Sequence, residues 1–242
     1  MCGRLSLFSP SEDLESRFEV FVPDEYAPSY NVAPGDDVTT IREDSPDVAE
    51  SVRWGLVPNW ADDPADWDLI NARAETLTEK PAFRDAVGRG SGGSTAGRCL
   101  ILTDGFYEWQ ARTEGKQPFY VRRSDGEPFA MAGLYDRWNG ERAHKTNGDG
   151  PLTTATIVTT EPNDLLADLH HRMPVVLSRD EAWAWLDEGT DRVDVLDPRP
   201  WDGFEAHPVS TAVNDPSTDD PSLVEPIDAP VTDPQVGLDE FG

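Results

Sequence analysis

Apolar and β-branched residues are concentrated in short runs, and glycine, proline, asparagine and aspartate separate one run from the next. Runs of this length with turn-forming residues at their ends are typical of strands. Residues 29–43 and 51–61 predict two early strands, the second leading into a loop at Trp60. Further strands are predicted in the sequences CLILTDGFYEWQ, QPFYVRR, PFAMAGLYDRW and TTATIVTT, between residues 99 and 160.

Three segments are predicted to be helices. Residues 9–18 start with a serine cap and carry acidic residues in the first turn. Residues 160–170 have Thr160 as the cap, and residues 179–189 end at Gly189. Five or six strands with shorter helices between them indicate an α+β fold, a single domain with largely antiparallel strands around one core.

Two segments lack the apolar residues that a core needs. Residues 88–98, GRGSGGSTAGR, are predicted to be a flexible surface insertion, because the apolar rhythm resumes directly after them. From residue 216 to residue 242 the chain is acidic and rich in proline, and we expect a disordered tail. The folded domain should therefore cover residues 2–215.

Composition narrows the setting in which the protein works. The chain has no apolar run of about 18 residues that would span a membrane, and it has no secretory signal, so we expect a cytoplasmic protein. Its two cysteines, Cys2 and Cys99, are a poor basis for a disulfide framework. Cys99 lies in the apolar run RCLIL and is expected to be a buried structural thiol.

The charge is strongly negative, with 47 acidic and 20 basic residues and a net charge of −27. Such a surface ordinarily argues against nucleic acid, because phosphates must be neutralised by positive charge. Acid-rich, lysine-poor proteins are also found in extreme halophiles, where molar salt shortens the Debye length to about 3 Å. We favour this halophilic interpretation over an acidic interaction module.

Cys2 follows the initiator methionine directly. If Met1 is removed, the new first residue carries a thiol and an α-amine, whose reference pKa values of about 8.5 and about 7.7–8.0 leave both usable near neutral pH. The alternative for Cys2 is a small apolar side chain that packs under the first strand.

Five separated motifs must be considered together: MCGR (1–4), RWGLVPNW (53–60), NARAET (71–76), DGFYEW (104–109) and HHRMPVVL (170–177). In this order and spacing they closely resemble the SRAP family, the SOS response-associated peptidases. The sequences SYNVAP, KPAFR, AGLYDRW and HPVSTAVN are also similar, so the resemblance extends from residue 2 to about residue 214. It implies a barrel-like core with peripheral helices.

The resemblance implies a covalent bond between Cys2 and an abasic site in single-stranded DNA. The α-amine would attack the sugar aldehyde to give a Schiff base, and the thiol would close a five-membered thiazolidine ring. Removal of Met1, which the family name attributes to self-cleavage, would be part of this mechanism. The cross-link would shield the lesion during the DNA damage response.

Three further residues match catalytic positions of the family. Glu108 would lie beside Cys2 and relay protons. His170, two residues before the arginine of the H-x-R-M-P motif, would assist Schiff-base formation or opening of the sugar ring, and the spacing favours it over His171. Asn71 would hold the sugar or the N-terminus in position.

The resemblance also implies how DNA would be bound. Arg4, Arg73 and Arg172 match positions that grip the phosphates next to the lesion, and Trp60 and Trp109 match positions that contact or stack on bases. We find no zinc pattern or phosphate-cradling glycine loop, so we expect no metal and no cofactor. We expect a monomer, with replication-fork proteins as candidate partners.

Two other functions remain open at this point. In an N-terminal-nucleophile hydrolase, Cys2 would attack an amide bond, and the enzyme would be regenerated after each cleavage. A non-catalytic single-stranded DNA-binding module would keep the arginines and tryptophans and tolerate the loss of Cys2.

Overall fold

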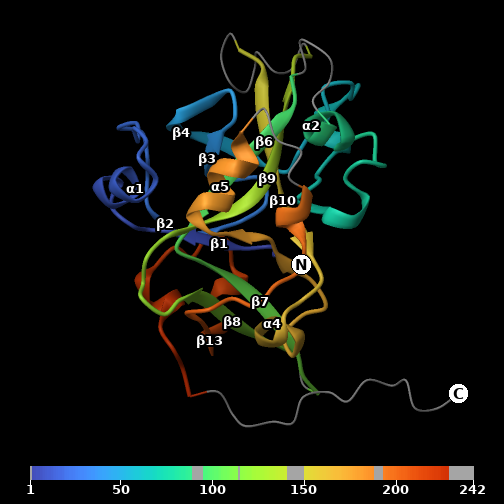
Figure 1. Cartoon of the computed structure of the whole chain (residues 1–242). Helices are drawn as coiled ribbons and strands as arrows, with labels where there is room; N and C mark the ends of the chain where they lie inside the picture. The colour runs from blue at the N-terminus through green and yellow to red at the C-terminus, as the bar shows by residue number, and fades with distance from the viewer. Residues whose placement is uncertain (1, 89–94, 114, 141–149, 188–192, 229–242) are drawn as a thin grey trace, which may run out of the picture.

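Five strands close into a barrel, which forms the upper part of the molecule in Figure 1. The computed structural model describes residues 2–88, 95–113, 115–140, 150–187 and 193–228. Neighbouring strands pair antiparallel except where β10 and β4 meet in parallel and close the ring. The strands, in their order around the barrel, are β4 (Ser45–Trp54), β3 (Asp37–Arg42), β6 (Gly97–Thr103), β9 (Phe129–Trp138) and β10 (Leu152–Thr160).

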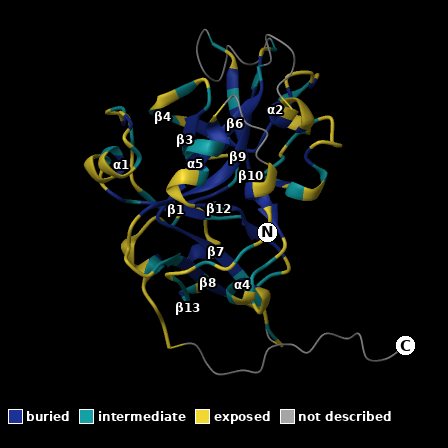
Figure 2. Ribbon diagram, viewed as in Figure 1, coloured by how far each residue is buried: buried dark blue, intermediate teal, exposed yellow. Residues whose placement is uncertain are grey.

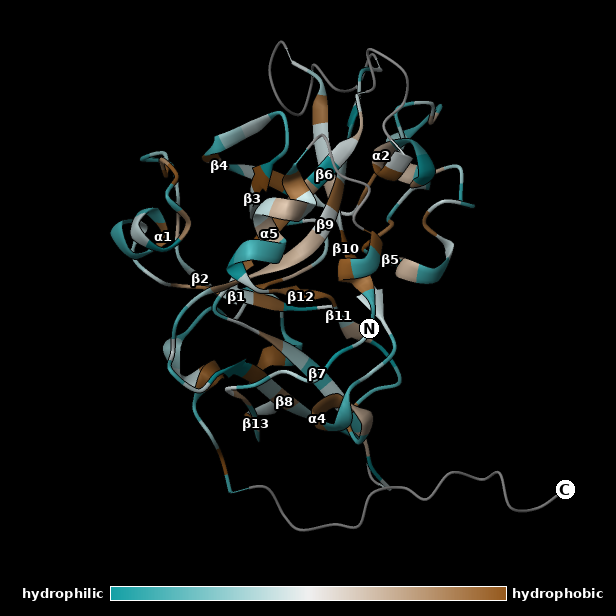
Figure 3. Ribbon diagram, in the orientation of Figure 1, coloured by the Kyte–Doolittle hydropathy of each residue, from teal (hydrophilic) through white to brown (hydrophobic). Residues whose placement is uncertain are grey.

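The strands of the barrel are apolar because most of them are covered on both sides. All seven residues of β6 are buried, which explains why its residues 99–102 are apolar without a break rather than alternating with polar ones. Two helices, α2 (Arg84–Gly88) and α5 (Arg179–Leu186), pack on the outside of β6 and β9. Figure 2 shows these strands as mostly buried, and Figure 3 shows the apolar residues concentrated along them.

A second sheet of five antiparallel strands lies below the barrel (Figure 1). Its strands, in order, are β13 (Phe204–Pro208), β8 (Lys116–Arg123), β7 (Gly105–Ala111), β1 (Leu5–Leu7) and β2 (Ser29–Val32). The chain passes from β6 of the barrel into β7 of this sheet at Asp104, whose backbone N–H donates to the carbonyl of Ser6. The first residues of the chain therefore lie where the two sheets join.

Short elements complete the described chain. The strand β5 (Asn71–Arg73) joins β10 in parallel, and β11 (Met173–Pro174) and β12 (Val176–Leu177) extend the edges of β10 and β9. The remaining helices are α1 (Ser11–Phe18), α4 (Asp164–Ala167), η1 (Pro64–Asp66), η2 (Ala74–Thr76), η3 (Val193–Leu196), η4 (Thr211–Asn214) and η5 (Pro221–Val224). The α+β prediction is confirmed.

Two helix starts differ from the sequence prediction because their serine or threonine has another role. The backbone N–H and hydroxyl of Ser9 donate to Asp104, and α1 begins only at Ser11. Thr160 is the last residue of β10, and α4 is capped instead by Asn163, which accepts from the Leu166 N–H at 3.1 Å. The predicted end of the third helix at Gly189 lies outside the described residues.

Both segments that were expected to lack structure are partly ordered. The predicted 88–98 insertion is too long at its end, since β6 already begins at Gly97 and Arg98 is buried against Trp185; residues 89–94 lie outside the described chain. The predicted 216–242 tail is wrong for residues 216–228. Leu223 there is fully buried, and the Tyr30 N–H donates to Asp219. Residues 229–242 are not described.

Candidate active site at Cys2

Cys2 lies immediately before β1 and is fully buried. It belongs to an apolar cluster that also contains Leu5, Trp54 and Ile157, and the Arg4 backbone N–H interacts with the thiol. Burial raises the pKa of the Cys2 thiol well above its usual value, and the negative charge of Glu108 raises it further. Near neutral pH the side chain is therefore a protonated thiol beside a carboxyl group.

Asn71 holds the backbone of Cys2. As the first residue of β5 it pairs with Ile157 of β10, and its Nδ2 donates to the Cys2 carbonyl oxygen at 2.9 Å. The Asn71 Oδ1 atom is buried and has no hydrogen-bond partner among the described residues. Because buried polar atoms are normally satisfied, this oxygen is an acceptor available to a group that enters the site. The expected contact of Asn71 with the substrate sugar stays a prediction.

Glu108 lies in the middle of β7, opposite Phe119 of β8, and is 1% exposed. Burial raises the pKa of its carboxyl to about 7, although the positive charge of the amino terminus lowers it. A carboxyl group with this pKa can both donate and accept a proton near neutral pH. The charge of Glu108 acts on the Cys2 thiol, and its role in relaying protons stays a prediction.

His170 follows α4, and its Nδ1 accepts from the Arg172 backbone N–H at 3.0 Å. Partial burial lowers the pKa of His170 to about 4, and the charges of the amino terminus and His171 lower it further. The ring is therefore neutral at pH 7. Nδ1 also lies 3.2 Å from the Arg172 carbonyl oxygen, and the shorter bond from the Arg172 N–H favours the tautomer that carries its proton on Nε2. His171 stacks on His170 with 4.2 Å between ring centroids, but its own side chain is exposed.

The three arginines expected to bind phosphates have different surroundings. Arg73 is exposed. Arg4 is half-buried and donates to Asn31 Oδ1 at 2.7 Å and to a backbone carbonyl at 2.6 Å. Arg172 is buried, and its two terminal nitrogens donate to the carboxylate of Glu75 at 2.7 and 2.9 Å. Only Arg73 among these three is thus presented to solvent without a rearrangement.

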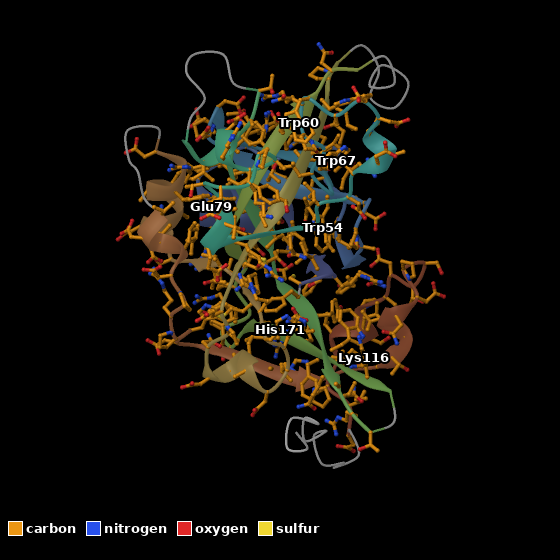
Figure 4. The ribbon with its side chains drawn as sticks, turned by 90° about the vertical axis from the view of Figure 1, so that its right-hand side faces the viewer. Trp54, Trp60, Trp67, Glu79, Lys116 and His171 are labelled. Atoms are coloured by element: carbon orange, nitrogen blue, oxygen red, sulfur yellow. The ribbon has the colours of Figure 1, made fainter. Side chains whose placement is uncertain are left out.

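The two tryptophans expected to contact bases also differ. Trp60 is 48% exposed and meets Trp67 edge to face. Trp109 is half-buried, and its Nε1 donates to Asn214 Oδ1 at 2.8 Å. Figure 4 shows Trp60 and Trp67 in the upper part of one face and His171 lower down, on the side where Figure 1 marks the N-terminus.

Sequence reasoning missed two charged residues at this site. Glu75 belongs to the motif NARAET, but nothing in its spacing indicated that it would pair with Arg172. Lys116 begins β8, and its charge contributes to the lowered pKa of His170. The pairing of β7 with β8 brings Lys116 to this face (Figure 4), and no short-range pattern reports such a pairing. Within the described ranges, no group of three His, Cys, Asp or Glu side chains is placed to hold a metal.

No helix in the described part of the chain has the length and hydropathy needed to cross a membrane. Cys99 is fully buried, as its apolar run predicted.

Comparison with known proteins places this site in a family. A family model described as SOS response associated peptidase (SRAP) matches residues 1–216. The abasic site processing protein YoqW of Bacillus subtilis is 41% identical over 235 residues, which cover 93% of this chain and 99% of YoqW. The abasic site processing protein HMCES of Gallus gallus is 34% identical over 237 residues, covering 84% of this chain and 67% of HMCES.

The fold is found in a solved structure as well. A crystal structure of a Bacteroides thetaiotaomicron protein superimposes with a TM-score of 0.79 at 26% sequence identity, covering 93% of this chain and 100% of that one. The family model spans every motif around Cys2. The chain therefore belongs to the SRAP family.

Proposed function

We propose that this protein processes abasic sites in single-stranded DNA by forming a thiazolidine between Cys2 and the lesion. The observation that carries the proposal is the surroundings of Cys2, whose backbone carbonyl is held by Asn71 and whose thiol lies in the field of Glu108. The relatives YoqW and HMCES, named abasic site processing proteins, support the choice of substrate.

The reaction begins with hydrolysis of the Met1–Cys2 peptide bond, which consumes one water and frees the α-amine. That amine adds to C1′ of the ring-opened deoxyribose, and loss of one water gives the Schiff base. The thiol sulfur then adds to the same carbon, and its proton ends on the former imine nitrogen. Only an N-terminal cysteine offers an amine and a thiol in the 1,2 arrangement that a five-membered ring needs.

The neighbouring side chains supply the proton transfers. The Cys2 thiol is protonated, so it must lose its proton as it attacks; the carboxylate form of Glu108 is the acceptor. The protonated form of Glu108 can donate to the hydroxyl that leaves as water, because a pKa of about 7 populates both forms near neutral pH. Neutral His170 serves as a donor through Nε2 during ring opening.

DNA would be held by phosphate contacts and by stacking. Arg73 is exposed and needs no rearrangement to meet a phosphate. Arg172 would bind a phosphate by replacing its ion pair with Glu75, whose side chain is 47% exposed. A carboxylate and a phosphate present similar oxygen pairs to a guanidinium, so this exchange keeps the arginine satisfied throughout.

The test is incubation with a single-stranded oligonucleotide that carries one abasic site, followed by denaturing electrophoresis and mass spectrometry. We expect a denaturation-resistant adduct of protein lacking Met1. Cys2→Ala abolishes the stable adduct, and Cys2→Ser does not restore it because an oxazolidine hydrolyses more readily. Adduct formation by protein that retains Met1 would contradict the mechanism. Binding without any adduct, unaffected by Cys2→Ala, would instead indicate a non-catalytic DNA-binding module.

An N-terminal-nucleophile hydrolase differs from the proposed function in its electrophile, which is an amide carbonyl rather than a sugar aldehyde. Such an enzyme would release cleaved peptide over many cycles and would leave the abasic oligonucleotide unmodified. A stable adduct formed at one equivalent of DNA per protein excludes turnover of that kind.

A further inference from the structure

Trp60 is exposed although the loop that carries it is firmly held. Nearly half of its surface, 48%, is accessible, whereas Trp54 and Trp185 are fully buried and Trp138 is 3% exposed. An exposed indole contributes little to folding, since the gain from burying apolar surface is proportional to the area removed from water. Large exposed aromatic side chains on rigid loops are typical of binding surfaces.

Two hydrogen bonds fix this loop on the barrel, and a third closes a turn within the loop. The Val57 N–H donates to Thr154 Oγ1 at 2.9 Å, and the Asn59 N–H donates to the buried carboxylate of Asp136 at 2.7 Å. On the far side of Trp60, the Ala61 N–H donates to the Pro58 carbonyl at 2.9 Å. The backbone on both sides of Trp60 is thereby fixed, which leaves the side-chain rotamer as the freedom that remains.

Trp67 restricts that remaining freedom. Its ring meets the ring of Trp60 edge to face, with 4.9 Å between centroids and an angle of 88° between planes. Edge-to-face contact is a favoured geometry for aromatic pairs, because the positive edge of one ring faces the negative face of the other. Trp67 is itself supported from below by an apolar cluster of Val57, Ala61, Trp138 and Leu152.

A dedicated turn presents Trp67 at this place. Asp63 caps η1 by accepting from the Ala65 N–H at 3.0 Å, Pro64 occupies the first helical position, and Trp67 follows as the C-terminal cap. Four residues later the same segment reaches Asn71, which holds Cys2. Four residues span at most about 14 Å, so the aromatic pair lies within reach of a short stretch of single strand bound at Cys2.

The charge around the pair indicates which part of DNA it meets. Asp62, Asp66 and Asp68 are exposed in the same segment and would repel phosphates. Stacking on a base needs no positive charge and tolerates any sequence. The aromatic pair is therefore suited to a base, with the sugar-phosphate backbone directed away from the acidic segment.

We infer that Trp67 is a positioning residue, which holds the Trp60 ring in the orientation that stacks on a base beside the lesion. The inference rests on the proposed function, since it assumes that single-stranded DNA is bound. Trp67 acts through Trp60 rather than by its own contact with DNA. Its removal should therefore weaken binding only while Trp60 is present.

The test measures binding separately from chemistry. The probe is a fluorescently labelled single strand with a tetrahydrofuran abasic analogue, which has no aldehyde and cannot be cross-linked. Trp67→Leu keeps the apolar packing of the cluster but loses the aromatic edge, and we expect its Kd to rise about three- to tenfold. Trp67→Phe keeps an aromatic edge and should restore most of the affinity. Phe21→Ala is the matched control, because Phe21 is 59% exposed and pairs with Val48 of β4, outside this loop.

A double-mutant cycle decides between positioning and direct contact. If Trp67 acts through Trp60, the double variant Trp60→Ala/Trp67→Leu binds no more weakly than Trp60→Ala alone. With a genuine abasic oligonucleotide, Trp67→Leu should slow cross-linking at low DNA concentration and leave the rate at saturation unchanged. Thermal unfolding of each variant checks that the barrel is intact.

The outcomes separate this inference from the proposed function. Wild-type affinity in Trp67→Leu, additive losses in the double variant, or an equal loss in Phe21→Ala would each overturn the positioning role. None of these results affects the proposed function as long as the wild-type protein forms the adduct. Absence of adduct and of binding in the wild-type protein would contradict the proposed function itself, and with it the inference.

Discussion

Glu108 is the residue whose surroundings are most clearly arranged for chemistry. It is 1% exposed, has a pKa of about 7 because of burial, and raises the pKa of the neighbouring Cys2 thiol through its charge. We predict that Glu108→Gln slows cross-linking by about 100-fold or more. The amide keeps the shape of the side chain but cannot exchange protons, so the Kd for an aldehyde-free abasic analogue should change less than about twofold. Equal losses of affinity and rate would make Glu108 a structural residue.

The same substitution should change how stability depends on pH. Burial raises the pKa of Glu108 from 4.5 to about 7, so between these values the unfolded chain ionises the group while the folded chain keeps its proton. Ionisation in the unfolded state favours unfolding, and the wild-type protein therefore loses stability relative to Glu108→Gln as the pH rises through this range. The difference in the free energy of unfolding between pH 4.5 and pH 8 should be of the order of 3 kcal/mol. Parallel stability profiles of the two proteins from urea unfolding would refute the raised pKa.

The histidine pair gives a prediction with a built-in control. His170 is half-buried and bonded to the Arg172 backbone, whereas His171 is exposed and only stacks on it. His170→Ala should reduce the rate of adduct formation by at least about tenfold, and His171→Ala should reduce it far less. The rates are compared under single-turnover conditions. The reverse ranking would mean that the motif was assigned in the wrong register.

At the scale of elements, the segment after Asp215 contributes more than its composition suggested. The helix η5 places Leu223 in a fully buried position beside Tyr107, Tyr120 and Val209. We predict that Leu223→Ala lowers the free energy of unfolding by about 2–4 kcal/mol, since it leaves a cavity in this cluster. Ile227→Ala, at a position that is 39% exposed, should have an effect below about 1 kcal/mol. Equal effects in denaturant unfolding would show that the segment does not pack as described.

Most strands and helices were predictable, but some of their boundaries were not. The strand runs were predicted because buried strands need continuous apolar sequence. The side chains of Ser9 and Thr160 are suited to cap a helix, and the sequence therefore predicts a cap at each of them. In the fold, the Ser9 hydroxyl donates to Asp104, and Thr160 ends a barrel strand where it pairs with Met173. Neither partner can be inferred from the residues next to Ser9 or Thr160. Proline and acidic residues after residue 215 indicate disorder, yet Leu223 is fully buried because it packs against residues from other parts of the fold.

At the scale of the whole molecule, we expect the net charge of −27 to affect both folding and the proposed binding of DNA. At low salt the carboxylates repel one another and the phosphates, since the Debye length is about 30 Å at 0.01 M and about 3 Å at 1 M. Arg73 and the indole of Trp60 would contact DNA directly. Salt therefore weakens their interactions with DNA less than it weakens the long-range repulsion between carboxylates and phosphates. We predict that the yield of adduct rises with potassium chloride concentration into the molar range.

The salt experiment needs a measure of folding beside it. Adduct formation is followed from about 0.1 to about 3 M salt, a range that brings the Debye length from about 10 Å to below 3 Å. Circular dichroism at each concentration separates refolding of the chain from improved binding. A steady fall in yield while the protein stays folded, as counterion release alone predicts, would refute the halophilic interpretation.

The sequence by itself determined the fold class and the family, and it indicated the residue proposed to react. Periodicity and turn residues are local properties, and the 1,2 arrangement of amine and thiol in Cys2 is a property of one residue. The tertiary structure decided which side chains lie beside that residue. The pairing of β5 with β10 places Asn71 against the Cys2 carbonyl, and the pairing of β1 with β7 brings Glu108 close enough for its charge to act on the thiol. It also decided that Arg172 is buried against Glu75 and that Trp67 supports Trp60. Contacts of this kind depend on strand pairing and loop placement, for which residue spacing carries no signal.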